Sequence, residues 1–118
     1  MSRNRVYIMV AVLVLFFVAG GVLIYATRSH GGQNVTIDLN VTGGSKMTPD
    51  NVTAHQNDKV TINVTSDMEG EVHLHGYDIH FDTMPGQKVT HTFTADKTGK
   101  FLIEWESTST ELGNFVVS

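Results

Sequence analysis

The sequence predicts an all-β domain, a Greek-key β-sandwich of about seven strands, preceded by one N-terminal transmembrane helix. Three observations predict it: apolar and polar residues alternate from Val35 onward, turn residues recur at short intervals, and residues 6–27 carry no charge. Alternation with a period of two is typical of strands with one buried face, and regular turns between short strands are typical of sandwiches. After residue 27 no segment has a helical period.

The N-terminal apolar segment, residues 6–27, reads VYIMVAVLVLFFVAGGVLIYAT. At about 1.5 Å per residue, a helix of this length crosses a hydrocarbon layer of about 30 Å. Arg3 and Arg5 precede it, so residues 1–5 are expected in the cytoplasm and the rest outside it, in the periplasm or extracellular space. A cleaved signal peptide is the alternative, but the apolar run is long for one and Ala26-Thr27-Arg28 is a poor cleavage site. We therefore expect a single-pass signal anchor in the cell membrane.

A short linker, residues 28–34, is expected between the anchor and a domain spanning residues 35–118. From residue 28 onward the chain carries six basic and all twelve acidic side chains, which gives a net charge of −6. This acidic balance argues against binding to nucleic acid or to anionic lipid. The chain has no cysteine, so it can form neither a disulfide nor a thiolate metal site.

Strands are expected at seven places, each with alternating apolar residues between turn signals: 35–41, 52–55, 60–64, 71–81, 89–93, 101–105 and 115–117. The first strand shows the pattern well, because Val35, Ile37 and Leu39 share one face and the residues between them are polar. Gly43-Gly44-Ser45 then breaks it. A loop is expected over residues 107–111.

Four of the six histidines fall within nineteen residues: His73, His75, His80 and His91. His73 and His75 lie two apart in an expected strand, so their rings project from the same face. If that strand runs unbroken from 71 to 81, these two histidines lie at the rim of its core-facing side and His80 faces solvent. His91 has the core-facing parity of the strand 89–93.

Imidazole and carboxylate ligands suit Cu(II) or Zn(II), so the histidines are candidate metal ligands. We expect His73 and His75 as the primary ligands, with His91 and Glu106, or alternatively Glu111, as helpers. The competing interpretation is a hydrogen-bonded strand end, because half-buried histidines are commonly satisfied by backbone carbonyls. Met68 and Met84 flank the histidine strand and are interpreted mainly as packing residues.

Three sequence blocks, in order, resemble the cupredoxin family. They are Met47–Ala54 followed by Asn57–Ile62, His75-Gly76-Tyr77 leading to Pro85-Gly86, and Gly99–Trp105 followed by Gly113 and Val116. The resemblance covers nearly all of residues 35–118. It implies a cupredoxin-like sandwich in which His75, or else His73, takes the place of the first copper-binding histidine.

The chain departs from the family at the other copper ligands. Where the family has a cysteine, a second histidine and an axial methionine, this chain has Trp105, Thr108 and Glu111. Without a thiolate there is no blue copper centre, so any copper here is expected to be non-blue Cu(II). We expect Trp105 to face the core and fill the space of the missing ion.

Two functions from different classes follow. The first is a membrane-anchored metal-binding or metal-delivery module, most simply for copper, without enzymatic activity. The second is a degenerate cupredoxin that serves as an accessory or assembly subunit of a larger membrane complex, such as a metal-dependent oxidase or oxygenase. A third interpretation is a glycosylated surface protein, because Asn34, Asn40, Asn51 and Asn63 each begin an Asn-Val-Thr sequence. The alternation of inward valine with outward Asn and Thr explains the same repeats without sugar.

Overall fold

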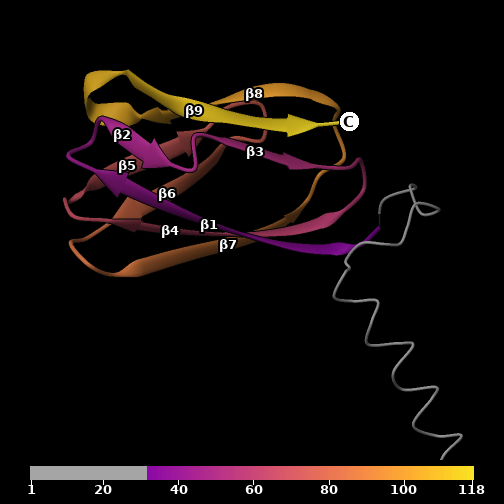
Figure 1. The fold of residues 1–118 in the computed structure, drawn as a ribbon, viewed down its shortest axis with the longest axis horizontal. Coiled ribbons are helices and arrows are strands. Elements are labelled where there is room, and N and C mark those ends of the chain that lie inside the picture. The colour runs from indigo at the N-terminus through magenta and orange to yellow at the C-terminus, as the bar shows by residue number, and fades with distance from the viewer. Residues whose placement is uncertain (1–31) are drawn as a thin grey trace, which may run out of the picture. The chain divides into compact units, whose positions relative to one another are not determined.

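The computed structural model describes residues 32–118, which form two facing β-sheets (Figure 1). The four-stranded sheet has the order β2-β1-β4-β7, with β1 Asn34–Thr42, β2 Lys46–Thr48, β4 Lys59–Ser66 and β7 Lys88–Thr94. The five-stranded sheet has the order β3-β9-β8-β5-β6, with β3 Asn51–Ala54, β5 Gly70–Leu74, β6 Ile79–Thr83, β8 Gly99–Trp105 and β9 Thr110–Val117. The prediction of an all-β sandwich is confirmed.

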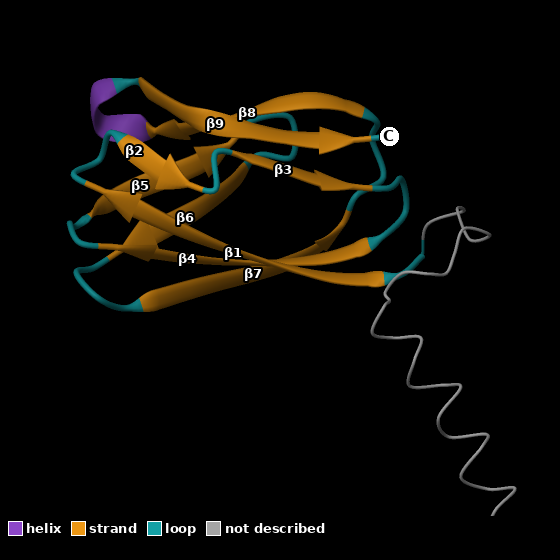
Figure 2. Ribbon diagram, in the orientation of Figure 1, coloured by secondary structure: helices purple, strands orange, loops and turns teal. Residues whose placement is uncertain are grey.

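The only helical element within residues 32–118 is a short 3-10 turn, Glu106–Thr108, drawn in purple in Figure 2. It lies in the connection from β8 to β9, where a loop was expected. None of the helical structure in this range is long and apolar enough to cross a membrane. The expected anchor, residues 6–27, lies outside the described residues and stays a prediction.

Period-two alternation produces the core as expected. In β1 the residues Ile37, Leu39 and Val41 are buried, while the polar residues between them are exposed. β1 pairs in parallel with β4, whose Val60 and Val64 are fully buried. The same rule explains the Asn-Val-Thr repeats: their valines face inward, and Asn34, Asn40 and Asn51 are exposed.

The expected single strand over residues 71–81 is wrong, because the chain reverses in the middle of it. Gly76 has φ 86° and Asp78 has φ 54°, and this left-handed turn joins β5 to β6 as an antiparallel hairpin. Glycine adopts positive φ without strain, and aspartate tolerates it better than most residues. The reversal resets the alternation, so Val72 and Leu74 point into the core. His73 and His75 therefore lie on the outer face of the five-stranded sheet, opposite to the expected side.

Two further differences from the sequence prediction lie in the strands that flank the core. β2 is a strand of three residues in which only Met47 is buried, too short to show a period. β9 begins at Thr110, earlier than expected, and a register shift beside Ile103 and Glu104 lets both Leu112 and Phe115 face inward. Such a bulge adds one residue to a strand and therefore exchanges its faces.

Trp105 ends β8 on the inner face of the sheet and is only 2% exposed. Two glycines make room for its indole, because a Cβ at Gly44 or at Gly70 would overlap the ring. The prediction that Trp105 faces the core is confirmed. A second aromatic group packs Tyr77 against the rings of Phe93, Phe101 and Phe115.

Candidate metal site on the outer face of the five-stranded sheet

Three neighbouring strands bring histidine and glutamate into one row across the outer face of the five-stranded sheet. His73 on β5 lies opposite His80 on β6, and on its other side it lies opposite Glu104 on β8. Directly paired residues in a sheet have Cβ atoms about 4.5–5.5 Å apart, so their side chains contact each other. The pairing of β5 with its hairpin neighbour β6 and with the more distant strand β8 thus assembles the row.

Four more ligand-type residues surround the row. We call the full set the outer-face cluster: Glu71, His73, His75, Asp78, His80, Glu104 and Glu106. Glu71 and His75 lie two residues before and after His73, on the same face of β5. Asp78 comes from the hairpin turn, and Glu106 follows β8.

The three imidazole rings lie side by side. His73 stacks on His80 with ring centroids 4.2 Å apart and planes 9° from parallel, and it lies equally close to His75 at a tilt of 37°. Nε2 of His75 is 2.7 Å from Oε1 of Glu104. One ligand atom from each of His73, His75 and Glu104 falls within 4.8 Å of the others, a separation that an ion could close by small side-chain movements.

His73 occupies the centre of the cluster, and its side chain is 15% exposed. Its Nε2 lies 3.3 Å from Oδ1 of Asp78. Its Nδ1 lies 3.1 Å from Oε1 of Glu106, in a geometry that makes no hydrogen bond, so this buried nitrogen has no hydrogen-bond partner. Buried polar atoms are normally satisfied, and a water molecule or an ion beside Nδ1 is one explanation for an unsatisfied one.

The cluster changes the protonation of its outer members. Hydrogen bonding to Glu71 raises the pKa of His80, and the Asp78 carboxylate adds to this shift. Hydrogen bonds from His73 and His80 lower the pKa of Asp78. His80 therefore faces a carboxylate at both ring nitrogens, an arrangement that favours a bound cation, either a proton or a metal ion.

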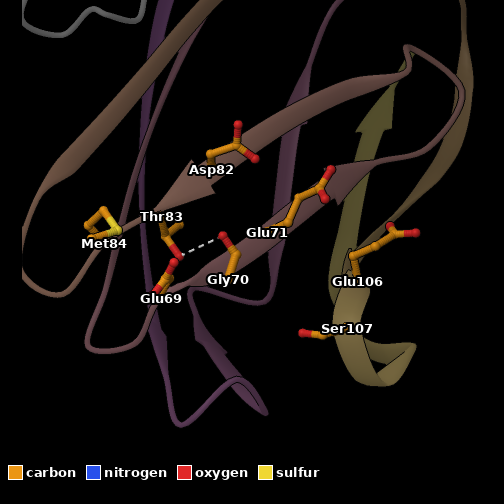
Figure 3. A pocket seen from close by; sticks show the side chains of 8 residues that line it. All are labelled: Glu69, Gly70, Glu71, Asp82, Thr83, Met84, Glu106 and Ser107. Carbon is orange, nitrogen blue, oxygen red and sulfur yellow. Dashed lines mark hydrogen bonds between the residues drawn. The ribbon is translucent and has the colours of Figure 1, made fainter.

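An open pocket of about 420 Å³ adjoins the cluster (Figure 3). Its lining includes Glu71 and Glu106 from the cluster, together with Glu69, Asp82 and the thioether of Met84. Met84, which was interpreted as a packing residue, is 46% exposed. Four carboxylates in one pocket produce a negative potential that attracts cations towards the cluster.

The sequence-predicted ligands do not all converge. The structure brings together His73, His75 and Glu106, while His91 lies on β7 in the other sheet, where its ring packs edge-on against Phe81 at 5.0 Å. Glu111 pairs with Glu104 at the next position of the row. The candidate ligands predicted from the sequence did not include Glu71, Asp78, His80 and Glu104. His80 faces solvent as expected, and it meets His73 because His73, expected on the core-facing side, lies on the same outer face.

The positions that correspond to a blue copper site do not form one. Trp105 is buried between the sheets, Thr108 is exposed and bonded to the Thr110 hydroxyl, and His75 lies on the outer face. With no cysteine in the chain, these residues do not fit a blue copper ion. Imidazole and carboxylate groups on the outer face do fit a Cu(II) or Zn(II) ion.

Residues 32–118 have a cupredoxin-like fold. A chain of a heme-copper terminal oxidase dimer is similar over 99% of both chains, with 15% identity and a TM-score of 0.62. A copper-binding protein in its apo form is similar over 74% of this chain and 97% of its own, with 17% identity and a TM-score of 0.60.

A third similar structure is the Cu(I)-bound metal-binding domain of the Cu(I)-exporting P-type ATPase of Streptococcus pneumoniae. It is matched over 74% of this chain and 97% of its own, with 10% identity and a TM-score of 0.58. No protein-family model matches the chain, and no curated protein matches it in sequence. At these identities the similarity establishes the cupredoxin-like fold.

Proposed function

We propose that this protein is a membrane-anchored, extracytoplasmic copper-binding module whose ion is held by His73, His75 and Glu104, with Glu106 beside them. One observation carries the proposal: among residues 32–118, every ion-pair contact of a carboxylate is to a histidine, and none is to a lysine or arginine. Carboxylates crowded together without fixed cations repel each other. A bound metal ion relieves that repulsion.

The ligand chemistry supports copper in its oxidised state. Cu(II) binds imidazole and carboxylate more tightly than the other divalent first-row metals do, and Zn(II) accepts the same ligands. The similar copper-binding structures add support for copper over zinc. In this role His75 binds through Nε2, the nitrogen that faces Oε1 of Glu104, and the Glu104 carboxylate binds the same ion and neutralises part of its charge.

We assign the protein a binding role rather than a catalytic one. Within the described range, the histidine side chains form hydrogen bonds only with carboxylates, and none activates a serine or threonine hydroxyl. A nucleophile paired with a base is the usual sign of covalent catalysis. Capture of copper at the membrane surface, followed by its delivery, needs only the ligands described above.

Copper titration of the full-length protein in mild detergent tests this proposal. We expect a Kd below about 1 μM for Cu(II), and at least about a tenfold loss of affinity in His75→Ala. His55→Ala is the matched control, because His55 is 66% exposed and lies outside the cluster. Binding weaker than micromolar in the wild-type protein, or equal losses in the two variants, would contradict the proposal.

A second role is supported by a separate observation. The match to a chain of a heme-copper terminal oxidase extends over 99% of both chains, whereas the two copper-binding domains match only 74% of this chain. We propose that the protein can serve as an accessory or assembly subunit of such a membrane complex. Affinity purification from native membranes in mild detergent tests this role: a heme absorbance spectrum that co-purifies supports it, and a chain that always purifies alone contradicts it.

A further inference from the structure

The outer-face cluster contains more ligands than one ion can use. Copper(II) and zinc ions in proteins take about four or five ligands, whereas the cluster offers three imidazoles and four carboxylates. The ion proposed above uses His75 and Glu104, part of His73, and Glu106. Glu71, Asp78 and His80 remain without a cation.

Asp78 and His80 form a second group of ligand atoms together with Nε2 of His73. Oδ1 of Asp78 lies 3.2 Å from Nε2 of His80 and 3.3 Å from Nε2 of His73. One ligand atom from each of these three residues falls within 4.8 Å of the others, as in the first group. Glu71 contacts the second nitrogen of His80, as the outer-shell carboxylates of metal-binding histidines commonly do.

His73 belongs to both groups, and its two nitrogens face in different directions. Nε2 faces Asp78, while the buried Nδ1 has no hydrogen bond and lies next to Glu106. An imidazole that loses its N–H proton can bind one ion through each nitrogen. His73 can therefore bind the first ion through its unsatisfied Nδ1 and a second ion through Nε2.

We propose that the cluster binds two divalent cations, the second held by His80, Asp78 and His73 Nε2. This inference rests on the proposed function, because the two sites share His73. Lone pairs on a ring nitrogen lie in the ring plane, so the stacked rings of His73 and His80 tilt towards each other when the ion binds. The N–H protons that the ion displaces pass to solvent.

The structure offers well-matched variants to test the second site. Asp78→Asn removes the charge and keeps the turn, because asparagine tolerates the φ of 54° found there. His80→Ala removes a ring that is 43% exposed, at little cost to the core. His75→Ala removes the first site, and His55→Ala again serves as the control. Circular dichroism of each variant checks that it is folded.

Titration of the metal-free, full-length protein with Zn(II), read by native mass spectrometry and calorimetry, counts the ions. We expect two equivalents for the wild-type protein and His55→Ala. We expect one equivalent for Asp78→Asn and His80→Ala, and one for His75→Ala. A single wild-type equivalent that is lost in His75→Ala and kept in His80→Ala would overturn the second site and leave the proposed function standing.

The titration can also support the site at His80 while contradicting the ligands of the proposed function. A single equivalent that is lost in His80→Ala and kept in His75→Ala would support the site at His80 and contradict the ligands of the proposed function. Two equivalents in His80→Ala, or no Zn(II) binding in the wild-type protein, would overturn the second site, whereas the Cu(II) titration described above decides the proposed function.

Discussion

The two faces of the five-stranded sheet are built from the same strands and have opposite chemistry. On the inner face, Val72 of β5 pairs with Trp105 of β8, and both are buried. At the next pair of these antiparallel strands, His73 pairs with Glu104 on the outer face, among other imidazoles and carboxylates. A single residue of register therefore separates the core from the candidate metal site.

The contrast between the two faces indicates which face of the sheet is available for a metal ion. The indole of Trp105 occupies the interior at the position where the cupredoxin resemblance places the cysteine, and Gly44 and Gly70 leave room for it. The polar ligands gather instead on the solvent side of the same strands. The inner face should therefore determine stability, and the outer face should determine metal binding.

Replacing Trp105 with alanine should have the largest effect on the inner face. Removal of a buried aromatic side chain typically costs about 3–5 kcal/mol of unfolding free energy, because it leaves a cavity. Guanidinium denaturation of the metal-free protein measures this loss. Trp105→Phe should cost less, and under conditions where it is folded it should bind as much copper as the wild type. A loss below about 1 kcal/mol for Trp105→Ala would mean that the interior is not packed as described.

Replacing Glu104 with glutamine should affect the outer face alone. The amide can still accept a hydrogen bond from His75, but it removes a charged ligand, so we expect at least about a tenfold loss of Cu(II) affinity, or about 1.4 kcal/mol. The unfolding free energy of the metal-free protein should change by no more than about 1 kcal/mol. Isothermal titration and denaturation on one preparation measure both. A change confined to stability would assign Glu104 a structural role.

The metal-free cluster should show a pH-dependent contribution to stability. The raised pKa of His80 stabilises the folded state in acid, and this contribution is lost as the pH rises through the folded pKa. The lowered pKa of Asp78 stabilises the folded state above the ordinary value of 3.8, and this contribution is lost as the pH falls through the folded pKa.

The melting temperature of the wild type should therefore exceed that of His80→Ala most clearly between about pH 4 and 6.5, the ordinary values for aspartate and histidine. Differential scanning calorimetry with a chelator, from pH 3 to pH 9, measures the difference. A difference that grows towards pH 9 would contradict the assigned direction of the His80 shift.

His91→Ala should have the smallest effect of the four variants. His91 contributes one edge-on contact with Phe81, and such contacts are worth about 0.5–1.5 kcal/mol. Copper affinity should equal that of the wild type, because the ring lies in the other sheet. A tenfold loss of affinity would restore His91 to the ligand set, where the sequence parity first placed it.

The sequence was sufficient to predict the sandwich because alternation and turns are local signals. Six of the seven expected strands have a single counterpart, the expected strand 71–81 is a hairpin, and the inward orientation of Trp105 follows from its parity with Ile103. The hairpin at Gly76 was missed because His73, His75 and Tyr77 continue an alternating pattern through a turn. The alternation alone does not show that the backbone reverses there.

The sequence predicted only some members of the candidate site, because the others depend on how the strands pair. The spacing of His73 and His75 places them on one face, but the contact with His80 arises from the unrecognised hairpin, and the contacts with Glu104 arise from pairing with β8, which is distant in sequence. Side-chain parity cannot reveal such partners without the register. Glu106 was predicted as a helper ligand and does lie beside His73. His91 was predicted from its position in the alternating pattern, but its strand, β7, belongs to the four-stranded sheet.

Tyr77 anchors the hairpin turn through hydrogen bonds to the Lys97 backbone. Its hydroxyl donates to the Lys97 carbonyl at 2.7 Å and accepts from the Lys97 amide at 3.0 Å, while the Lys97 ammonium donates to the Gly76 carbonyl. Asp78 therefore sits on a fixed backbone, although its side chain is 85% exposed. In the proposed metal site, ligands anchored in this way would lose little freedom on capturing an ion. Because they are open to water, an incoming chelator could reach such an ion and replace them one by one, so the proposed site favours rapid exchange over permanent storage.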